Sequence, residues 1–137
     1  GIGKLHKGKS DADLAEHLLR LTDTAAPGSL TFANFVEFDS LYGHRRDIPG
    51  YARQLEWFDT VVGQAIARLQ PGDLILFTAD HGNDPSWIGT DHTRERVPVL
   101  GAGLGARAIG NVGFSDIGAS VAAHLGLDPP KHGTSFI

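Results

Sequence analysis

The sequence predicts an α/β fold, a layered sandwich in which a mostly parallel sheet is flanked by helices. Segments with the apolar spacing of helices alternate along the chain with short apolar runs of strand length. The run at residues 74–79 is apolar almost throughout, which is typical of a strand buried on both faces of a parallel sheet. With 137 residues the chain has the length of one domain, so we expect residues 1–137 to form a single unit.

The first half of the chain predicts two helices and one strand. A helix is expected over residues 11–22, because Ser10 is a suitable N-cap and leucines recur behind it at helical spacing. Aromatic and β-branched residues at 31–38 predict a strand that ends at Asp39. Apolar residues then recur every three or four positions over 50–69, which predicts the longest amphipathic helix.

The second half predicts two strands and one helix. After the strand at 74–79, a long polar loop leads to a short strand at 97–100. The glycine-rich loop at 101–113 has no helix directly behind its glycines, so we expect no dinucleotide site there. Ser115 is expected to cap a final helix that ends near Leu125.

The composition excludes several classes of protein. Twelve Lys and Arg residues against sixteen Asp and Glu residues give a net charge of -4, and with no basic run we expect no nucleic-acid partner. The chain has no cysteine, which removes disulfides, thiolate nucleophiles and cysteine-based zinc sites. A metal site would therefore have to use carboxylates and some of the seven histidines.

The chain contains no apolar stretch that approaches the roughly 20 residues needed to cross a bilayer, and its N-terminus has none of signal-peptide length. We therefore expect a cytoplasmic protein without a membrane partner. The chain begins without methionine, in residues that resemble the end of a strand, which indicates a piece of a longer protein.

Five potential metal ligands follow the predicted strands. Asp39 directly follows one strand and has His44 five residues later. Asp80 and His81 directly follow another strand, and His92 lies on the loop behind them. Because ligands bind at the carboxyl ends of strands in open α/β sheets, neighbouring parallel strands would bring these groups to one edge. They are more than one divalent ion usually takes from protein and too few to complete two sites, so they indicate a two-metal site with ligands missing.

Each of these residues also has an interpretation without a metal. An aspartate after a strand is commonly a turn residue or a helix cap. His92 lies in a polar loop, where most side chains face solvent. The remaining histidines have no ligand partner at a useful spacing: His6, His17, His124 and His132.

Three polar segments carry a recognisable pattern: FDSLYGHRRD at residues 38–47, TADHGNDP at 78–85 and GTDHTRE at 89–95. Together they resemble phosphopentomutases of the alkaline phosphatase superfamily, and the resemblance runs through nearly the whole chain to the GTSF segment at 133–136. The ADHG element also resembles cofactor-independent phosphoglycerate mutases, whereas the first and third segments resemble phosphopentomutases in particular.

The resemblance implies an alkaline-phosphatase-like sandwich that is only partly contained in this chain. Residues 1–137 would form the C-terminal part of the metal-binding catalytic core. The N-terminal segment of the core and the inserted cap domain of the family would lie outside the chain.

The resemblance also implies two divalent metal ions, typically Mn²⁺. Asp39, His44 and His92 match the ligands of one ion. Asp80 and His81 match ligands of the other ion, which in the family is completed by a further aspartate and by a threonine nucleophile. Neither of those two residues has a counterpart in this chain.

The implied activity is that of an isomerase that interconverts ribose 1-phosphate and ribose 5-phosphate, and the deoxyribose pair, through a phosphothreonine and a bisphosphorylated sugar. The partners would be the pentose phosphate substrate and the missing N-terminal part of the same enzyme. We expect this chain alone to be inactive, because it lacks the nucleophile. Two alternatives stay open: another member of the superfamily, such as a cofactor-independent phosphoglycerate mutase or a phosphatase, and a metal-binding domain without catalysis.

Other residues in or near these segments have open roles. Three aspartates are able to orient the second ring nitrogen of a ligand histidine, or simply face solvent: Asp47, Asp84 and Asp91. Three arginines are able to bind phosphate, the first two being equally able to pair with Asp47 or Asp59: Arg45, Arg46 and Arg94. Trp57 and Phe58 are expected to pack, and Trp87 is in position to form a wall of the site.

Overall fold

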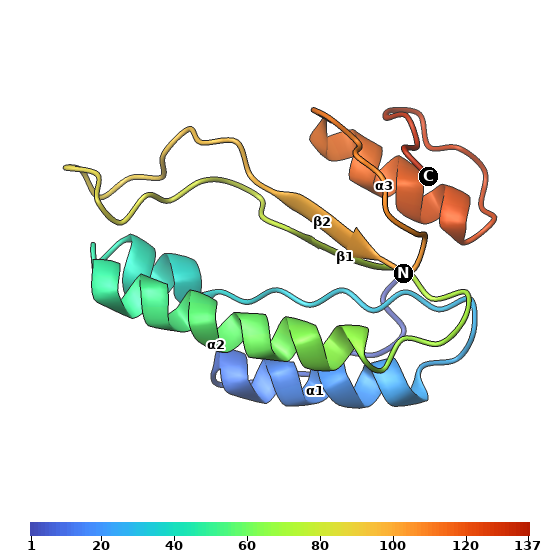
Figure 1. Cartoon of the computed structure of the whole chain (residues 1–137), viewed down its shortest axis with the longest axis horizontal. Coiled ribbons are helices and arrows are strands. Elements are labelled where there is room, and N and C mark those ends of the chain that lie inside the picture. Colours follow the sequence, from blue (N-terminus) through green and yellow to red (C-terminus); the bar gives the residue numbers. More distant parts are fainter.

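The computed structural model describes all 137 residues and is a layered α/β arrangement (Figure 1). Its elements in chain order are α1 (Asp11–Thr24), the π-helix η1 (Phe38–Gly43), α2 (Ile48–Ile66), β1 (Ile75–Thr78), β2 (Val99–Ala102) and α3 (Phe114–His124). In Figure 1 the two-stranded sheet lies between the α1–α2 pair and α3. The α/β class predicted from the sequence is therefore confirmed.

The sheet consists of one antiparallel pair, in which Ile75 of β1 lies opposite Ala102 of β2. The prediction of a mostly parallel sheet is therefore wrong for the strands of this chain. Parallel neighbours need a crossover connection, usually a helix, whereas residues 79–98 contain no helix and fold back as a long arm (Figure 1). An isolated bridge between Gly82 and Thr93 joins the two sides of this arm.

The segment at 31–38 is not a strand, although the sequence predicts one. Residues 30–35 make no backbone hydrogen bond to another backbone group, so they pair with neither β1 nor β2. Burial nevertheless alternates along the segment as in a strand: Phe35 is half-buried, whereas Phe32 is 86% exposed. The residue pattern therefore predicted the side-chain alternation correctly but not the lack of a pairing strand.

Side-chain caps explain where the first two α-helices begin. The Ser10 hydroxyl accepts a hydrogen bond from the backbone N–H of Asp13 at 3.2 Å, which confirms the predicted cap of α1. Asp47 caps α2, where its carboxylate accepts a hydrogen bond from the N–H of Gly50 at 2.9 Å. The observed helix ends differ from the predicted ones by a turn or less, as is usual for such boundaries.

The last helix begins differently from the prediction. Ser115 lies inside α3, and the N-cap is Gly113, whose N–H donates to the Asp116 carboxylate at 2.8 Å. The same carboxylate accepts a hydrogen bond from the N–H of Thr134 at 2.8 Å, so the C-terminal segment is held against the start of the helix. The bonds from Thr134 and Gly113 lower the pKa of Asp116 below its ordinary value.

Aromatic rings form the contact between α2 and its neighbours. The ring centroid of Phe58 lies 4.9 Å from that of Phe35 and 5.7 Å from that of Phe38, in edge-to-face pairs. On the side of the sheet it lies 6.2 Å from Phe77 of β1. Trp57 lies 6.3 Å from Phe58. The packing role predicted for Trp57 and Phe58 is confirmed.

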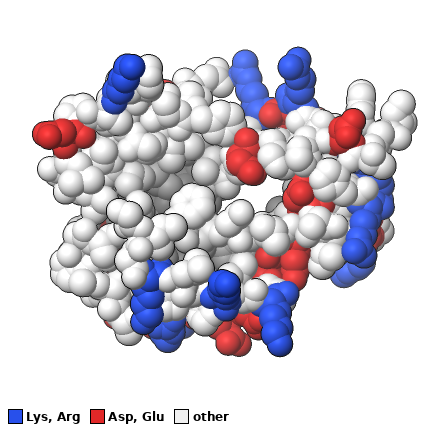
Figure 2. Space-filling model, turned by 180° about the vertical axis from the view of Figure 1, so that it is seen from behind, with Lys and Arg blue, Asp and Glu red and all other residues white.

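Few apolar side chains are fully buried, and the buried ones are small: Ala15, Val61, Ala65 and Ala119. Large apolar side chains stay in contact with solvent, among them Ile2 (86% exposed) and Ile88 (98% exposed). Figure 2 shows a face that is hollowed near its centre, with acidic and basic side chains interspersed around it and no continuous basic patch. None of the helices has the length and apolar character that a membrane span requires.

One buried carboxylate joins three segments. Asp11, at the start of α1, is 1% exposed and accepts hydrogen bonds from the backbone N–H groups of Val36 (3.0 Å) and Glu37 (3.3 Å). The side-chain amide of Gln54 in α2 donates to the same carboxylate at 3.1 Å. In return, the N–H of Asp11 donates to the Glu37 carboxylate at 3.1 Å. Burial, followed by the charge of Glu37, raises the pKa of Asp11.

Replacing Asp11 by alanine should lower the free energy of unfolding by about 2–4 kcal/mol, because donors on Val36, Glu37 and Gln54 lose their acceptor. Asp11→Asn should cost less, because it keeps one acceptor oxygen. The raised pKa means that the folded state holds the Asp11 proton more tightly than the unfolded chain does. The contribution of Asp11 to stability therefore falls as the pH rises from about 4 through the folded-state pKa, and Asp11→Asn should remove this slope.

Urea unfolding of the three proteins at a series of pH values between 4 and 7 measures both effects. An Asp11→Ala protein as stable as the unsubstituted one would show that this carboxylate does not join the three segments in solution.

Candidate metal centre

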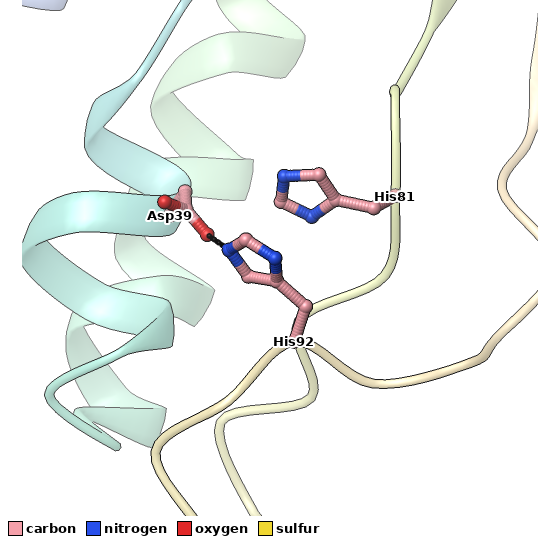
Figure 3. A group of neighbouring side chains, drawn as sticks. All are labelled: Asp39, His81 and His92. Atoms are coloured by element: carbon pink, nitrogen blue, oxygen red, sulfur yellow. Dashed lines mark ion pairs between the residues drawn. The ribbon is translucent and has the colours of Figure 1, made fainter.

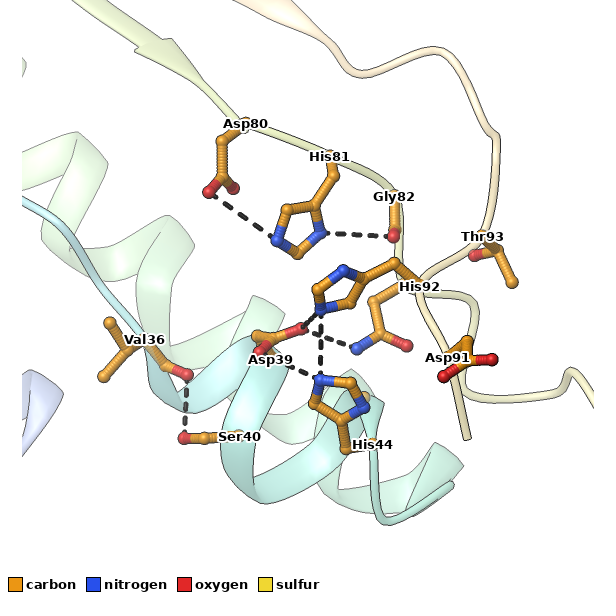
Figure 4. Close-up of polar contacts among 12 residues, drawn as sticks. Val36, Asp39, Ser40, His44, Asp80, His81, Gly82, Asp91, His92 and Thr93 are labelled. Carbon is orange, nitrogen blue, oxygen red and sulfur yellow. Dashed lines mark hydrogen bonds and ion pairs between the residues drawn. The ribbon is translucent and has the colours of Figure 1, made fainter. Parts of the chain in front are cut away.

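The π-helix η1 presents Asp39 at the edge of the site. The N–H and the hydroxyl of Ser40 both donate to the carbonyl of Val36 at 2.9 Å, which fixes the entry of the chain into η1. Phe38 packs against Tyr51 of α2 with ring centroids 5.4 Å apart. Asp39 turns its carboxylate toward the arm formed by residues 79–98 (Figure 4). Short π-helical turns of this kind are frequent at functional sites.

His44 directly follows η1 and faces Asp39. Its backbone N–H donates to the carbonyl of Asp39 at 2.9 Å, and its Nε2 lies 3.3 Å from Oδ2 of Asp39. The other ring nitrogen, Nδ1, lies 2.5 Å from the carbonyl oxygen of Thr90 on the arm. Because a carbonyl oxygen only accepts, Nδ1 carries the hydrogen, and Nε2 of the neutral ring presents a lone pair.

His92 and His81 approach the same carboxylate from the arm (Figure 3). Nε2 of His92 lies 3.2 Å from Oδ1 of Asp39 and 3.1 Å from Nε2 of His44. The ring of His81 stacks on that of His92 with centroids 3.7 Å apart. One ligand atom from each of Asp39, His81 and His92 lies within 4.8 Å of the other two.

Asp80 lies at the margin of this cluster. Its Oδ2 is 3.6 Å from Nε2 of His81, and its side chain is 82% exposed. Figure 4 shows it connected to His81 alone. The structure therefore brings four of the five sequence-predicted ligand residues together and leaves Asp80 beside them: Asp39, His44, His81 and His92 form the group.

The donor atoms of this cluster fit a divalent metal ion. Two ligand atoms that bind an ion at about 2.1 Å, with angles near 90–110°, lie about 3.0–3.4 Å apart. The Nε2 atoms of His44 and His92 and the carboxylate oxygens of Asp39 are separated by 3.1–3.3 Å. Imidazole together with carboxylate suits divalent first-row metals. A cation among these atoms would also remove the repulsion between the lone pair on His44 Nε2 and the carboxylate.

Backbone carbonyl groups, rather than carboxylates, contact the second nitrogens of two of these rings. The carbonyl of Thr90 contacts Nδ1 of His44, and the carbonyl of Gly82 lies 3.3 Å from Nδ1 of His81. Of the two roles left open for three aspartates, the orienting one does not occur in this structure, since none of their carboxylates contacts a histidine: Asp47, Asp84 and Asp91. Backbone carbonyls occur at every position, so the sequence carries no signal for this contact.

Asp84 instead accepts hydrogen bonds from the hydroxyl (2.7 Å) and the N–H (2.8 Å) of Ser86. These bonds, the hydroxyl first, lower the pKa of Asp84 below its ordinary value. Asp84 is therefore a turn residue within the arm.

The three arginines of the motifs have different surroundings. Arg46 donates to five oxygen atoms of the protein, and all three of its guanidinium nitrogens take part, although Nη2 has one acceptor for its two hydrogens: the acceptors are the carbonyl oxygens of Gly43, Asp84, Gly89 and Asp91 and the side-chain oxygen of Asn83. Arg45 is exposed and makes no polar contact, and neither it nor Arg46 pairs with Asp47 or Asp59. Arg94 is also exposed.

A pocket of about 430 Å³ adjoins the histidine cluster. It is lined by Trp87, His92, Thr93, Arg94 and Glu95, all of which belong to the arm. The wall-forming position predicted for Trp87 is confirmed, since its side chain borders the same cavity as His92. Arg94 is the one cationic side chain of this lining.

Asn83 is a site residue that sequence reasoning missed. It is 9% exposed, and its Nδ2 donates to Oδ1 of Asp39 at 2.7 Å. A Cβ atom at Gly43 would lie 2.5 Å from this amide nitrogen, so the close approach of the two segments requires glycine there. The position of Asn83 directly behind Asp80, His81 and Gly82 is the one signal that could have pointed to it.

Comparison with known proteins agrees with this cluster. A family model described as "Metalloenzyme superfamily" matches residues 1–129. Curated relatives named phosphopentomutase match the whole chain at 53% identity in Allorhizobium ampelinum, 50% in a Chelativorans species and 49% in Chromohalobacter salexigens.

In each of these relatives the match covers 34% of the relative's own length, so the chain spans about a third of the curated proteins that it resembles. The family model, by contrast, covers nearly all of the chain. Together with the convergence of carboxylate and imidazole groups, this match shows that the chain belongs to the Metalloenzyme superfamily.

Proposed function

We propose that residues 1–137 form the C-terminal part of the metal-binding catalytic core of a phosphopentomutase, an isomerase that interconverts (deoxy)ribose 1-phosphate and (deoxy)ribose 5-phosphate. The observation that carries the proposal is the cluster of Asp39, His44 and His92, whose donor atoms have the spacing of metal ligands. The phosphopentomutase names of relatives at 49–53% identity support the choice of reaction. A cytoplasmic location is part of the same proposal.

The proposal includes two divalent ions, with Mn²⁺ as the metal. Asp39, His44 and His92 would hold one ion, and the contact between His81 and Asp80 supports a second position beside it. The stacked rings of His81 and His92 would keep the two positions adjacent. When bound, such ions neutralise charge on phosphoryl oxygens and lower the pKa of an attacking hydroxyl.

The residues of the arm would hold the substrate. The pocket beside His92 offers Arg94 as a partner for a phosphate group and the ring of Trp87 as an apolar wall. Because Arg94 has no partner within the chain, its guanidinium is available for two parallel hydrogen bonds to phosphate oxygens. Arg45 is exposed next to the same cluster and is equally available.

The remaining parts of the site would come from the rest of the enzyme. The threonine nucleophile and the further aspartate of the proposed enzyme would lie outside residues 1–137. The exposed apolar side chains of the 30–36 segment, including Leu30, Phe32 and Val36, support a covering partner of the same polypeptide. The length of the relatives supports the same conclusion.

The 137-residue chain should show no mutase activity, because it lacks the nucleophile, whereas the complete protein should interconvert ribose 1-phosphate and ribose 5-phosphate. Parallel assays with 3-phosphoglycerate and with p-nitrophenyl phosphate separate this reaction from those of related mutases and phosphatases. Turnover of pentose phosphate by the chain alone, free of host enzyme, would refute its proposed inactivity. A complete protein that prefers phosphoglycerate would refute the proposed reaction.

The chain should bind Mn²⁺ weakly in a calorimetric titration, and His44→Ala should weaken this binding at least tenfold, because one of three clustered donors is lost. His132→Ala is a matched control, since His132 is exposed and contacts none of the cluster. If Mn²⁺ produces no heat of binding with the unsubstituted chain, or the same heat with His44→Ala, the result would favour a domain without this metal site.

Asp80→Ala and His92→Ala, made separately in the complete protein, should each reduce phosphoryl transfer at least a thousandfold while the fold survives, because both side chains lie on the exposed arm. Steady-state kinetics gives the first quantity and circular dichroism the second. Full activity in either variant would remove that residue from the metal site.

A further inference from the structure

Arg46 lies two residues after His44 and has a strained backbone conformation. Its φ angle is 56°, and it is the one non-glycine residue of the chain with a positive φ. L-residues with a side chain avoid this region unless surrounding contacts hold them there. The contacts in this case are the backbone hydrogen bond from the N–H of Arg46 to the carbonyl of Gly43 at 3.1 Å and the contacts of the guanidinium group, which together compensate for an unfavourable backbone.

The guanidinium of Arg46 connects the turn after η1 to both ends of the ligand-bearing loop. Its Nη1 donates to the carbonyl of Gly43 at 3.0 Å, within its own turn. The same nitrogen donates to Oδ1 of Asn83 and to the carbonyl of Asp84, both at 2.7 Å. Its Nη2 donates to the carbonyl of Asp91 at 2.8 Å, and its Nε donates to the carbonyl of Gly89.

Three of the five contacted residues, namely Gly43, Asn83 and Asp91, are bonded to a proposed metal ligand or adjacent to one in the chain. By accepting from Arg46 through Oδ1, Asn83 is fixed with Nδ2 toward Asp39, to which it donates at 2.7 Å. Gly89 and Asp91 flank Thr90, whose carbonyl orients His44. Asp91 also directly precedes His92 in the chain.

The bonds to Gly89 and Asp91 hold the backbone on either side of the carbonyl that sets the His44 tautomer. The bond to Asn83 holds the amide that occupies one lone pair of Asp39 and leaves the others for a cation. The guanidinium thus holds the neighbours of three clustered residues, namely Asp39, His44 and His92. Its contacts join two segments that are more than 35 positions apart in the chain.

We propose that Arg46 is a positioning residue of the metal centre: its guanidinium clamps the turn at 43–46 to the loop at 83–91 and so sets the distances among Asp39, His44 and His92. The proposal rests on the proposed metal-dependent function. The five contacts involve all three guanidinium nitrogens, so the role assigned to Arg46 is to hold protein segments together and not to bind phosphate. Lysine cannot replace it, since one ammonium nitrogen with three hydrogens does not serve five separate acceptors.

Two substitutions of Arg46 separate the side chain from the backbone. Arg46→Lys keeps the positive charge but loses the planar fork. Arg46→Gly removes the side chain and favours the observed φ angle, so it would be harmless if the residue served only the turn. Arg53→Lys is a matched control, because Arg53 is exposed on α2 and makes no polar contact.

Mn²⁺ titration of the complete protein, followed by the electron paramagnetic resonance signal of the free ion, should give a dissociation constant about 10-fold to 100-fold higher for Arg46→Lys and for Arg46→Gly. Arg53→Lys should leave it unchanged. Thermal unfolding monitored in parallel shows whether each variant is folded at the temperature of the titration. If Arg46→Gly does not fold, Arg46→Lys and Asn83→Ala provide the same test, with the same expected direction.

Dissociation constants within twofold of the unsubstituted value in folded Arg46→Lys would overturn the proposal, as would a merely lowered melting temperature with unchanged Mn²⁺ affinity. A complete protein that binds Mn²⁺ and shows the expected variant effects, but converts no pentose phosphate, would leave the role of Arg46 standing and refute the proposed reaction. An active mutase whose folded Arg46 variants bind Mn²⁺ normally would support the proposed reaction and refute the role of Arg46.

Discussion

The candidate site depends on one contact between distant segments, namely the hydrogen bonds that join the turn at 43–46 to the loop at 83–91. Asp39 and His44 come from one side of this contact and His81 and His92 from the other, so no segment alone contains the cluster. The close approach that these bonds enforce requires glycine at position 43 and an arginine with an unfavourable φ at position 46. The strained backbone of Arg46 and the absence of a side chain at Gly43 thus accompany the approach of the four proposed ligand residues.

Outside this contact the chain is loosely packed. The aromatic group around Phe58 and the carboxylate of Asp11 hold the helices, but the two-stranded sheet leaves the 30–36 segment without a strand partner. A two-stranded sheet is marginally stable in water unless other elements cover it. The relatives that match the whole chain are about three times as long, which is consistent with further elements packing against these surfaces.

The sequence predicted the helices, β1 and the convergence of the candidate site residues, because each leaves a local pattern: a cap, a period or a motif. It failed for the parallel sheet and for the strand at 31–38, because pairing depends on neighbours that no local pattern reports. The expected convergence occurs, although a π-helix and an arm produce it rather than two parallel strands. The role of Asn83 and the contacts of Arg46 could not be read from the motif, since both depend on groups that are distant in the sequence and meet only in the fold.

The π-helical geometry of η1 explains why the proposed ligands Asp39 and His44 are five residues apart. On an α-helix, residues five apart point about 140° away from each other, because each residue turns the helix by about 100°. A π-helix closes its hydrogen bond from residue i+5 to residue i, as the N–H of His44 does to the carbonyl of Asp39, so the fifth residue returns to the same face. Asp39 and His44 are therefore the wider-turn equivalent of the i, i+4 ligand pairs found on α-helices. Deleting one residue between them would keep them on one face only if the turn reverted to an α-helix, so the length of this turn decides whether the carboxylate of Asp39 and the imidazole of His44 meet.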